Sequence, residues 1–428
     1  EDVWSPVPPS IQAALEGATV IVNCSASDET IGKDTYRRAL ISGQSARLIS
    51  GYIYANAGEG ESTTDIVFGG HNEIIYSELD LQRITGERRK NTTFQPLDEE
   101  TLVRVPFTVE ETKTFLTRTF PKKPFVPSDE QTRAQRCEEI LTIQAMGLKK
   151  RLAHTNARTA VVGISGGLDS TLALLVTARA FDMLGRDKKD IIAVTMPCFG
   201  TTDRTYQNAC EMSKKVGATL IEVPIADAVN VHFRDIGHDP EDHSVTYENC
   251  QARERTQVLM DIANKTWGMV IGTGDLSELA LGWATYNGDH MSMYGVNASV
   301  PKTLVRHLVK YAADDTKDEA LKNVLYDVLV GPYELHDFFL YFMLRFGYEP
   351  SKIFRIACMT FDGEYDKETI FKWLETFCRR FFSQQFKRSC LPDGPKVGTV
   401  ALSPRGDWRM PSDACVAVWM KDLEACRV

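Results

Sequence analysis

The sequence predicts an α/β fold built on a doubly wound parallel sheet, preceded by part of a second α/β layer. Short apolar runs at 159–164, 191–195, 219–223 and 269–272 are typical of strands that are buried on both faces. Segments with helical periodicity at 170–184, 203–216 and 248–267 separate these runs, and such alternation indicates a parallel sheet covered by helices. Ligands of such sheets bind at the carboxyl ends of the strands, so we expect the chemistry in the loops after Ile164, Thr195 and Ile271.

The 428 residues are predicted to divide into three parts, 1–95, 96–127 and 128–428. In the first part, 18–23, 51–57 and 65–68 are expected to be strands, and 33–49 a helix. In the second part, Pro121, Pro124 and Pro127 disfavour regular structure and indicate a linker or extended arm. Ser128 and Asp129 offer an N-cap for a helix that runs to about residue 151.

Composition excludes several classes of protein. The net charge is −9, so a general nucleic-acid footprint is not expected. The ten cysteines form no CxxC pair or zinc-spaced cluster, which predicts reduced thiols and no disulfides. No apolar run is long enough to span a bilayer and no signal peptide opens the sequence, so a cytoplasmic protein without membrane contact is expected. Because the sequence does not begin with Met, we expect it to start inside a longer chain.

The strongest local motif is Ser-Gly-Gly-Leu-Asp-Ser at 165–170, between a predicted strand and a predicted helix. Adjacent glycines allow a tight turn, and amides at the start of a helix accept phosphate oxygens. No Gly-Lys-Ser/Thr follows, so the segment is not a Walker A loop. A turn without a ligand is the alternative, but the two serines and Asp169 after an unbroken apolar strand favour an anion site.

Asn249 and Arg253 lie four residues apart on a predicted helix and share a face, whereas Arg255 points away from them. An amide and a guanidinium on one face suit a ribose hydroxyl and a phosphate. The alternative is a solvated helix with a Glu/Arg pair.

Two further motifs follow the strand at 269–272. If 276–283 is helical, Glu278 and Gly282 face the same way, so a carboxylate lies beside a position with no side chain to block a ligand. The segment 297–303 then places Lys302 at the start of a helix.

The loop at 165–170 resembles the pyrophosphate-binding loop of the N-type ATP pyrophosphatases, which cleave ATP between the α- and β-phosphates to adenylate a substrate. With Asn-x-x-Ala-Arg-x-Arg at 249–255, Gly-Thr…Glu…Gly at 272–282 and Gly-Asp…Pro-Lys-Thr at 288–303, it resembles NAD synthetase over most of residues 126–310. The resemblance implies an adenine nucleotide alpha hydrolase-like fold for residues 128–428.

The same resemblance implies roles for the matching positions. The catalytic residues would be Asp169, Glu278 and Lys302. Asp169 and Glu278 would share Mg²⁺ with the ATP phosphates, and no redox cofactor is expected. ATP would be bound by Gly163, Ser165, Gly166, Gly167, Asp169, Ser170 and Thr273. Deamido-NAD would be bound by Asn249, Arg253, Glu278, Trp283, Ala284, Thr285, Tyr286, Asp289, Lys302 and Lys387.

The N-terminal part resembles the second half of the nitrilase-type glutaminase domain of glutamine-dependent NAD synthetases, an αββα sandwich. The resemblance rests on segments 6–9, 18–27, 31–33 and 54–65. In that family Glu-Asp-hydrophobic-Trp, found here at 1–4, follows the nucleophilic cysteine, so the Cys/Glu/Lys triad is absent from this sequence. Ser27 and Lys33 match positions that contact glutamine. Cys24 matches an ordinary position of a buried strand, and we expect it to be structural.

Several features receive a structural interpretation. His336 and the aromatic run 338–342 fit a packed helix or subunit contact, and His232, His238 and His243 are expected in a polar loop. The junctions at 76–80 and 327–331 are shorter than in the family, which missing segments would explain.

These features predict ATP-dependent amidation of deamido-NAD to NAD⁺ through an adenylate, with release of AMP and pyrophosphate and with ammonia from glutamine. Expected partners are ATP, deamido-NAD, glutamine or ammonia, and further copies of the chain in a homo-oligomer. A GMP synthetase-like ligase would share the 165–170 loop but not the later motifs. A nucleotide-binding regulator without catalysis is disfavoured by the presence of Asp169, Glu278 and Lys302.

Overall fold

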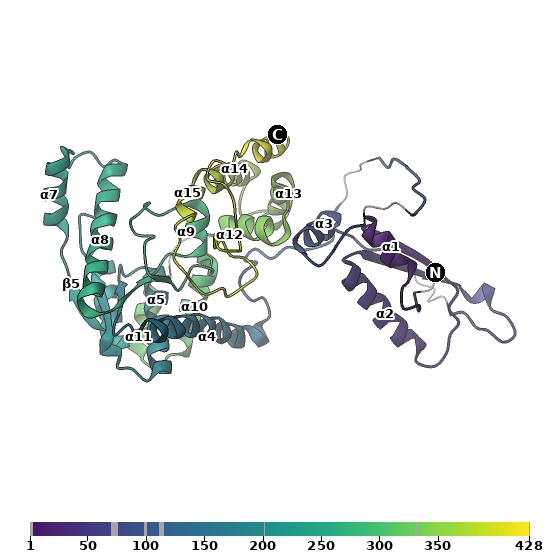
Figure 1. Cartoon of the computed structure of the whole chain (residues 1–428), viewed down its shortest axis with the longest axis horizontal. Coiled ribbons are helices and arrows are strands. Elements are labelled where there is room, and N and C mark those ends of the chain that lie inside the picture. The colour runs from purple at the N-terminus through teal and green to yellow at the C-terminus, as the bar shows by residue number, and fades with distance from the viewer. Residues whose placement is uncertain are drawn as a thin grey trace. The chain divides into compact units, whose positions relative to one another are not determined.

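The computed structural model describes residues 3–69, 76–97, 101–110, 115–200, 202–329 and 333–427. The chain divides into two compact units (Figure 1): Glu1–Thr119 with Phe346–Tyr348, and Phe120–Arg345 with Glu349–Val428. The short segment 346–348 belongs to the first unit, where the Tyr348 hydroxyl donates to Asp80 Oδ2 at 2.5 Å.

The first unit contains helices α1 (Pro9–Leu15), α2 (Lys33–Leu48) and α3 (Leu81–Lys90), with a 3₁₀ turn at Glu59–Glu61. Strands β1 (Val20–Ser25) and β2 (Gly51–Asn56) pair in parallel, with Val20 opposite Gly51. The strand expected at 65–68 is wrong. Ile66 and Val67 are 45% and 59% exposed, and no strand lies beside them among the described residues to complete a ladder.

The expectation that Cys24 is buried is also wrong. Along β1, Ile21 and Asn23 are buried whereas Val22 and Cys24 are exposed. Successive side chains of a strand point to opposite faces, and the two described strands of this sheet are covered on one face only. Cys24 therefore lies on the uncovered face, not in a core.

The second unit alternates strands and helices through its first half, as the sequence predicts. The strands are β3 (Ala160–Gly163), β4 (Ile191–Thr195), β5 (Thr219–Glu222), β6 (Met269–Gly272) and the short β7 (Tyr294–Gly295). The helices of this half are α4 (Glu130–Thr155), α5 (Leu168–Leu184), α6 (Asp203–Val216), α7 (Ala226–Ile236), α8 (Val245–Thr266) and α9 (Leu276–Leu281), with a 3₁₀ turn at Lys188–Asp190. Asp129 caps α4, its side chain accepting from Gln131 N at 3.0 Å.

The second half of the unit is helical. It contains α10 (Lys302–Asp315), α11 (Glu319–Asp327), α12 (Glu334–Tyr341), a π-helical turn at Phe342–Phe346, α13 (Pro350–Thr360), α14 (Lys367–Ser383), α15 (Gln385–Arg388) and α16 (Ala417–Glu424). Among the described residues, no helix is both long and apolar enough to cross a membrane. All ten cysteines lie in described segments, and none forms a disulfide in them.

The parallel sheet has the strand order β5-β4-β3-β6-β7, so the chain moves outward from β3 in one direction and then from β6 in the other. This is the doubly wound arrangement that the alternation predicts. The order reverses between β3 and β6, and ligands of such sheets bind at the carboxyl ends of the strands at this switch point. The loops that follow there begin at Ile164 and Thr273.

Alternate residues of the central strands feed two cores. Ala160 and Val162 pack with helices α4, α5 and α10 on one face, whereas Val161 packs with Val270 and with Ala263 of α8 on the other. These residues are all at most 2% exposed. Fully burying a Val side chain is worth about 1.5–3 kcal/mol, so both cores hold the strand ends in place.

Helix α7 is absent from the sequence prediction, which assigned its region to a polar loop. His232 lies on this helix, and only His238 and His243 lie outside it. Val229 and Phe233, four residues apart, face the core beside Cys250 of α8, and Gly237 ends the helix in the left-handed region.

The segment after α15 covers the outer edge of the sheet. Gly295 N on β7 donates to Asp393 O at 2.7 Å, as a neighbouring strand would. Gly394 approaches the same strand so closely that a Cβ at this position would lie 2.3 Å from Gly295 O. No side chain fits there without moving the backbone.

Candidate active site

The loop between β3 and α5 has the geometry of an anion site. Gly166 has a φ of 74°, and a Cβ on it would lie 1.9 Å from Thr205 O, so only glycine fits. Ser165 and Ser170 close the loop through their hydroxyls, which lie 3.2 Å apart, and Gly167 N donates to Ser165 Oγ at 3.3 Å. Helix α5 begins directly after Gly167, so its positive end faces the loop.

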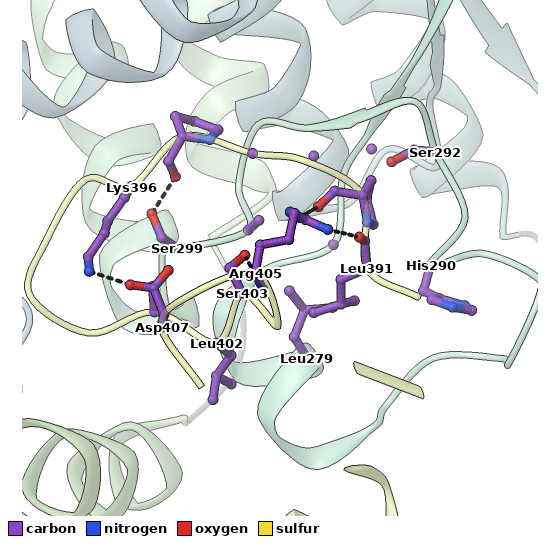
Figure 2. Close-up of a pocket in the computed structure, with 18 of the residues that line it drawn as sticks. Leu279, His290, Ser292, Ser299, Leu391, Lys396, Leu402, Ser403, Arg405 and Asp407 are labelled. Carbon is purple, nitrogen blue, oxygen red and sulfur yellow. Dashed lines mark hydrogen bonds and ion pairs between the residues drawn. The ribbon is translucent and has the colours of Figure 1, made fainter. Parts of the chain in front are cut away.

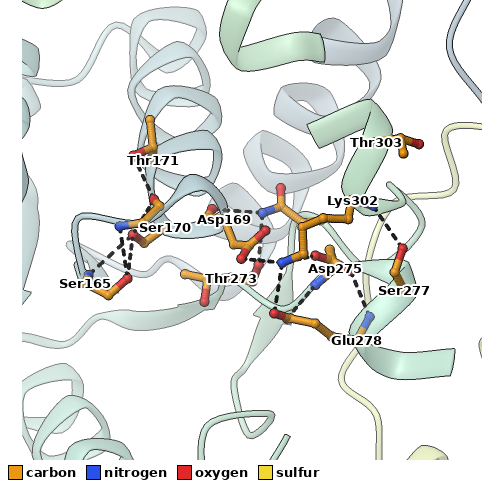
Figure 3. Close-up of polar contacts among 12 residues, drawn as sticks. Ser165, Asp169, Ser170, Thr171, Thr273, Asp275, Ser277, Glu278, Lys302 and Thr303 are labelled. Atoms are coloured by element: carbon orange, nitrogen blue, oxygen red, sulfur yellow. Dashed lines mark hydrogen bonds and ion pairs between the residues drawn. The ribbon is translucent and has the colours of Figure 1, made fainter. Parts of the chain in front are cut away.

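A cluster of four charged side chains lies beside this loop (Figure 3). Lys302 Nζ lies 2.6 Å from Asp169 Oδ2, 2.5 Å from Asp275 Oδ2 and 3.0 Å from Glu278 Oε1. The three carboxylates each offer an oxygen within 4.8 Å of the others. Three acids against one ammonium leave a negative site that attracts a further cation.

Burial sets the protonation of this cluster. Burial raises the pKa of Asp275 well above its ordinary value, and the charges of Glu278 and Asp169 raise it further. Burial, and next the charge of Asp169, raises the pKa of Glu278. Burial alone would lower the pKa of Lys302, but the three acids raise it above its ordinary value, so the ammonium keeps its proton.

Two residues of the site were missed by the sequence reasoning. Asp275, fully buried, accepts from Glu278 N at 2.9 Å while Asp275 N donates to Glu278 Oε2 at 3.3 Å, a capping box that begins α9. Asn297, also fully buried, donates from Nδ2 to Asp169 O at 3.1 Å and to Thr273 O at 3.0 Å. Asn297 thereby ties together the loops after β3 and β6.

A cavity of about 700 Å³ opens at the carboxyl ends of the strands and includes part of the loop 165–170. Of the predicted site residues, it is lined by Gly163, Ser165, Asp169, Ser170, Thr273, Glu278, Trp283, Ala284 and Asp289. Helix α8 contributes Gln251 and Arg255 to the wall. Arg255 thus points away from Asn249 and Arg253, as expected, but into the cavity.

The other predicted dinucleotide residues do not line this cavity: Asn249, Arg253, Thr285, Tyr286, Lys302 and Lys387. Thr285 Oγ1 donates to Asn249 Oδ1 at 2.9 Å, and the Arg253 guanidinium approaches Tyr286 O at 3.5 Å. Lys387 Nζ donates to Gly282 O at 2.8 Å and to Ala284 O at 2.6 Å. These contacts hold the segment 282–286 in place.

Asp289 and Trp283 shape the same end of the cavity. Asp289 Oδ1 accepts from Thr285 N at 2.6 Å, and burial raises the pKa of this carboxyl. The His336 ring packs in a T-shaped arrangement with two tryptophans, its centroid 5.1 Å from that of Trp283 and 5.2 Å from that of Trp373. Burial, and next the charge of Arg380, lowers the pKa of His336 to about 4. His336 is therefore a neutral packing residue, as the sequence interpretation expects.

Glycine is needed at position 282 for a different reason from the one predicted from the sequence. It ends α9 with a φ of 63°, and a Cβ there would lie 2.4 Å from Gln384 Cβ. The glycine makes room for the end of α14, not for a ligand beside Glu278.

A smaller pocket, of about 50 Å³, adjoins this cavity and shares Gly272, Asp289 and His290 with it (Figure 2). Ser299 Oγ donates to Pro395 O at 2.7 Å, and Arg405 donates to Leu391 O at 2.9 Å. These bonds fix the C-terminal segment over the sheet edge and close the back of the site.

Comparisons with known proteins point to one family. Residues 140–317 match the family model described as NAD synthase. The chain is 40% identical to the glutamine-dependent NAD(+) synthetase of Mycobacterium leprae, over 99% of this chain and 73% of that protein. The chain belongs to the glutamine-dependent NAD(+) synthetase family. A further relative, the synthetase of Thermotoga maritima, is 25% identical over 96% of this chain and 73% of its own length.

The fold is also that of a glutamine-dependent NAD(+) synthetase. The crystal structure of the enzyme from Cytophaga hutchinsonii superposes with a TM-score of 0.61 at 19% identity, over 96% of this chain and 71% of that chain. The match includes both compact units, in agreement with a synthetase domain joined to part of a nitrilase-like layer.

In the N-terminal unit of this NAD(+) synthetase family member, the predicted glutamine residues lie near one another. Ser27 N donates to Asn56 Oδ1 at 2.8 Å, and Lys33 Nζ pairs with Asp28 at 2.5 Å. Glu1 and Asp2 of the expected motif, and Gly331 at the junction 327–331, lie outside the described residues.

Proposed function

We propose that this chain catalyses the ATP-dependent amidation of deamido-NAD to NAD⁺, with AMP and pyrophosphate as the other products. The observation that carries the proposal is the cluster of Asp169, Asp275, Glu278 and Lys302 beside a glycine-rich anion loop. A carboxylate is a poor acyl donor because its oxygen does not leave, so the pyridine carboxylate must first attack the α-phosphate of ATP. The resulting anhydride with AMP then reacts with ammonia.

The acidic residues fit Mg²⁺. Asp169 Oδ1 is buried and has no hydrogen-bond partner among the described residues, and carboxylate oxygens are the ligands this ion prefers. Asp169 and Glu278 would hold the ion, with Asp275 behind them as a third acid. When bound, Mg²⁺ neutralises charge on the phosphates as they separate.

The protein itself supplies positioning and charge. The amides and hydroxyls of the Ser165–Ser170 loop would hold the departing pyrophosphate at the positive end of α5. The Lys302 ammonium, which is 2.6 Å from Asp169, can reach phosphate oxygens held beside that residue. The segment 283–289 would bind deamido-NAD, together with Asn249, Arg253 and Lys387, which contact the segment 282–286. Closing the site against water protects the anhydride from hydrolysis.

Glutamine is the proposed nitrogen source, through ammonia released in a nitrilase-type glutaminase domain. Ser27 and Lys33 would contact the glutamine. The Cys/Glu/Lys triad of the family is not among the residues of this sequence. The parts 1–95, 96–127 and 128–428 are our proposed division into glutaminase piece, linker and synthetase domain, and we further propose a homo-oligomer.

The test uses the 428-residue chain with ATP, Mg²⁺ and ammonium, which bypasses glutamine hydrolysis. Deamido-NAD should be converted to NAD⁺ with one AMP and one pyrophosphate per turnover, whereas xanthosine monophosphate should not react. ADP with orthophosphate as products, or equal use of xanthosine monophosphate, would reject the proposal.

A further inference from the structure

Helix α10 begins without a cap of its own. Its N-cap residue is Pro301, whose side chain accepts no hydrogen bond, yet Lys302 is the first helical residue. The first amides of a helix lack partners inside that helix, and leaving them unpaired in a buried position is costly. Lys302 and Thr303 are 5% and 8% exposed, so water does not readily supply these partners.

Two side chains from other helices provide the missing partners. Ser277 Oγ on α9 accepts from Lys302 N at 2.9 Å, and Asp337 Oδ2 on α12 accepts from Thr303 N at 2.8 Å. The Ser277 hydroxyl donates to Asp337 Oδ1. Because the hydroxyl proton is used by Asp337, the oxygen of Ser277 is left to accept from Lys302.

Asp337 is fully buried and has no direct contact with the acidic cluster among the described interactions. Ser277 and Asp169 lie on opposite sides of Lys302 (Figure 3). Ser277 also immediately precedes Glu278 on α9. The Asp337 carboxylate therefore accepts hydrogen bonds from both helices, from Ser277 next to Glu278 on α9 and from Thr303 next to Lys302 on α10.

Burying a carboxylate costs free energy unless hydrogen bonds and opposite charges compensate for its lost hydration. Burial raises the pKa of Asp337, while hydrogen bonds from Ser277 and Thr303 and the charge of Lys302 act in the opposite direction. The negative charge also faces the positive end of α10, which stabilises it.

We propose that Asp337 is a positioning residue that sets the start of α10, through Ser277 and Thr303, so that Lys302 meets Asp169 and Glu278. This inference rests on the proposed function for its kinetic consequence. Asp337 touches neither substrate nor metal in this assignment, so its loss changes the placement of Lys302 but removes no ligand.

The experiment measures ammonium-dependent NAD⁺ formation and thermal unfolding for Asp337→Ala, Asp337→Asn and Ser277→Ala in the full chain. A displacement of about 1 Å at a reacting group can cost about 100-fold in rate, so Asp337→Ala should lower kcat by about 10- to 100-fold. KM for deamido-NAD should change less than about threefold, because the segment 283–289 is untouched. Asn can satisfy only one of the two donors with its carbonyl, so Asp337→Asn should fall between Ala and the wild type.

The double variant Ser277→Ala/Asp337→Ala separates positioning from general damage. If the two residues act on Lys302 through one chain of bonds, the loss of kcat in the double variant should be close to that of the worse single variant. If they act independently, the two fold losses multiply, and the proposal is rejected.

Asp366→Ala is the matched control, since Asp366 caps α14 by accepting from Thr369 N at 2.6 Å and lies outside the site. It should lower Tm while leaving kcat per folded molecule unchanged. An Asp337→Ala variant that behaves in the same way overturns the proposal. Should Asp337→Ala not fold, Ser277→Ala carries the same test.

A binding measurement distinguishes failure of this inference from failure of the proposed function. With Mn²⁺ as the probe for the metal, Asp337→Ala should bind ATP more weakly than the wild type, because Lys302 no longer meets the phosphates although the acids are still present. A wild type that binds both but does not adenylate deamido-NAD would refute the proposed function alone. Unchanged binding together with unchanged kcat would refute the role of Asp337 alone.

Discussion

At the proposed phosphate end of the site, charged side chains contact one another directly, with Lys302 within 3.0 Å of three carboxylates. At the proposed dinucleotide end, Asp289 and Lys387 are instead held by backbone groups of the segment 282–285. The first end is therefore stabilised by attraction between one ammonium and three carboxylates, which depends on every member being present. The second end is stabilised by separate hydrogen bonds, and each can be lost with limited damage to the others.

The largest effect is expected at the charged end. Asp169→Ala and Glu278→Ala should each lower adenylation by about 10²–10³-fold even with ammonium as nitrogen donor, because they remove electrostatic stabilisation of the separating phosphates. Pyrophosphate exchange into ATP measures the step. Asp182→Asn, on the same helix as Asp169 but paired with Lys188 at the surface, is the control. Near-normal exchange by either site variant would show that the charged end does not depend on each of its members.

The next effect concerns stability. The Lys302 side chain is 6% exposed, and Lys302→Met leaves three acids without their ammonium, so the free energy of unfolding should fall by about 3 kcal/mol in the presence of a chelator. Chemical denaturation measures it. Mg²⁺ should restore more stability to the variant than to the wild type. Lys310→Met, at an exposed pair, should cost at most about 0.5 kcal/mol.

A third test addresses His336, the uncharged side chain that packs against Trp283. The pKa of His336 is lowered from 6.5 to about 4 by burial, so as the pH falls below 6.5 the unfolded chain takes up a proton that the folded chain does not. His336 thus costs the wild type up to about 1.4 kcal/mol of stability per pH unit between 6.5 and 4. His336→Phe, which keeps the ring contacts, should lose that part of the slope in pH-dependent unfolding. Parallel curves for the two proteins would show that His336 is not held neutral.

The smallest effect is expected at Lys387. Lys387→Met removes two hydrogen bonds to segment 282–284, and KM for deamido-NAD should rise about tenfold with kcat nearly unchanged. Steady-state kinetics with varied deamido-NAD measures it, and the exposed Lys421→Met is the control. A fall in kcat as large as that of Asp169→Ala would mean that the two ends do not differ as described.

Much of the fold could be predicted because the signals are local. The mostly apolar runs at 191–195 and 269–272 are strands with the predicted bounds, since burial on both faces leaves Thr195 as the one polar side chain in them. The loop 165–170 was also recognisable, because its two serines form hydrogen bonds with backbone groups inside the loop itself. Helix α7 could have been found from Val229, Phe233 and the terminal Gly237.

The remaining features depend on partners far along the chain. Asp275 carried a local signal, an acid three residues before Glu278, but its pairing with Lys302 is a tertiary contact. Asn297 joins two loops that only the sheet brings together, and Gly282 is explained by Gln384 on α14. The exposure of Cys24 follows from how many layers cover β1, which no periodicity in β1 itself reveals.

The bond from Gly295 to Asp393 sets an order of events during synthesis. The central strands can assemble only after β6 has emerged from the ribosome, and the outer margin of the sheet stays uncovered until the chain reaches Asp393. An unpaired margin invites pairing with another nascent chain. Truncated translation products, or chains from which proteases have removed this segment, would then tend to aggregate instead of forming a smaller active enzyme.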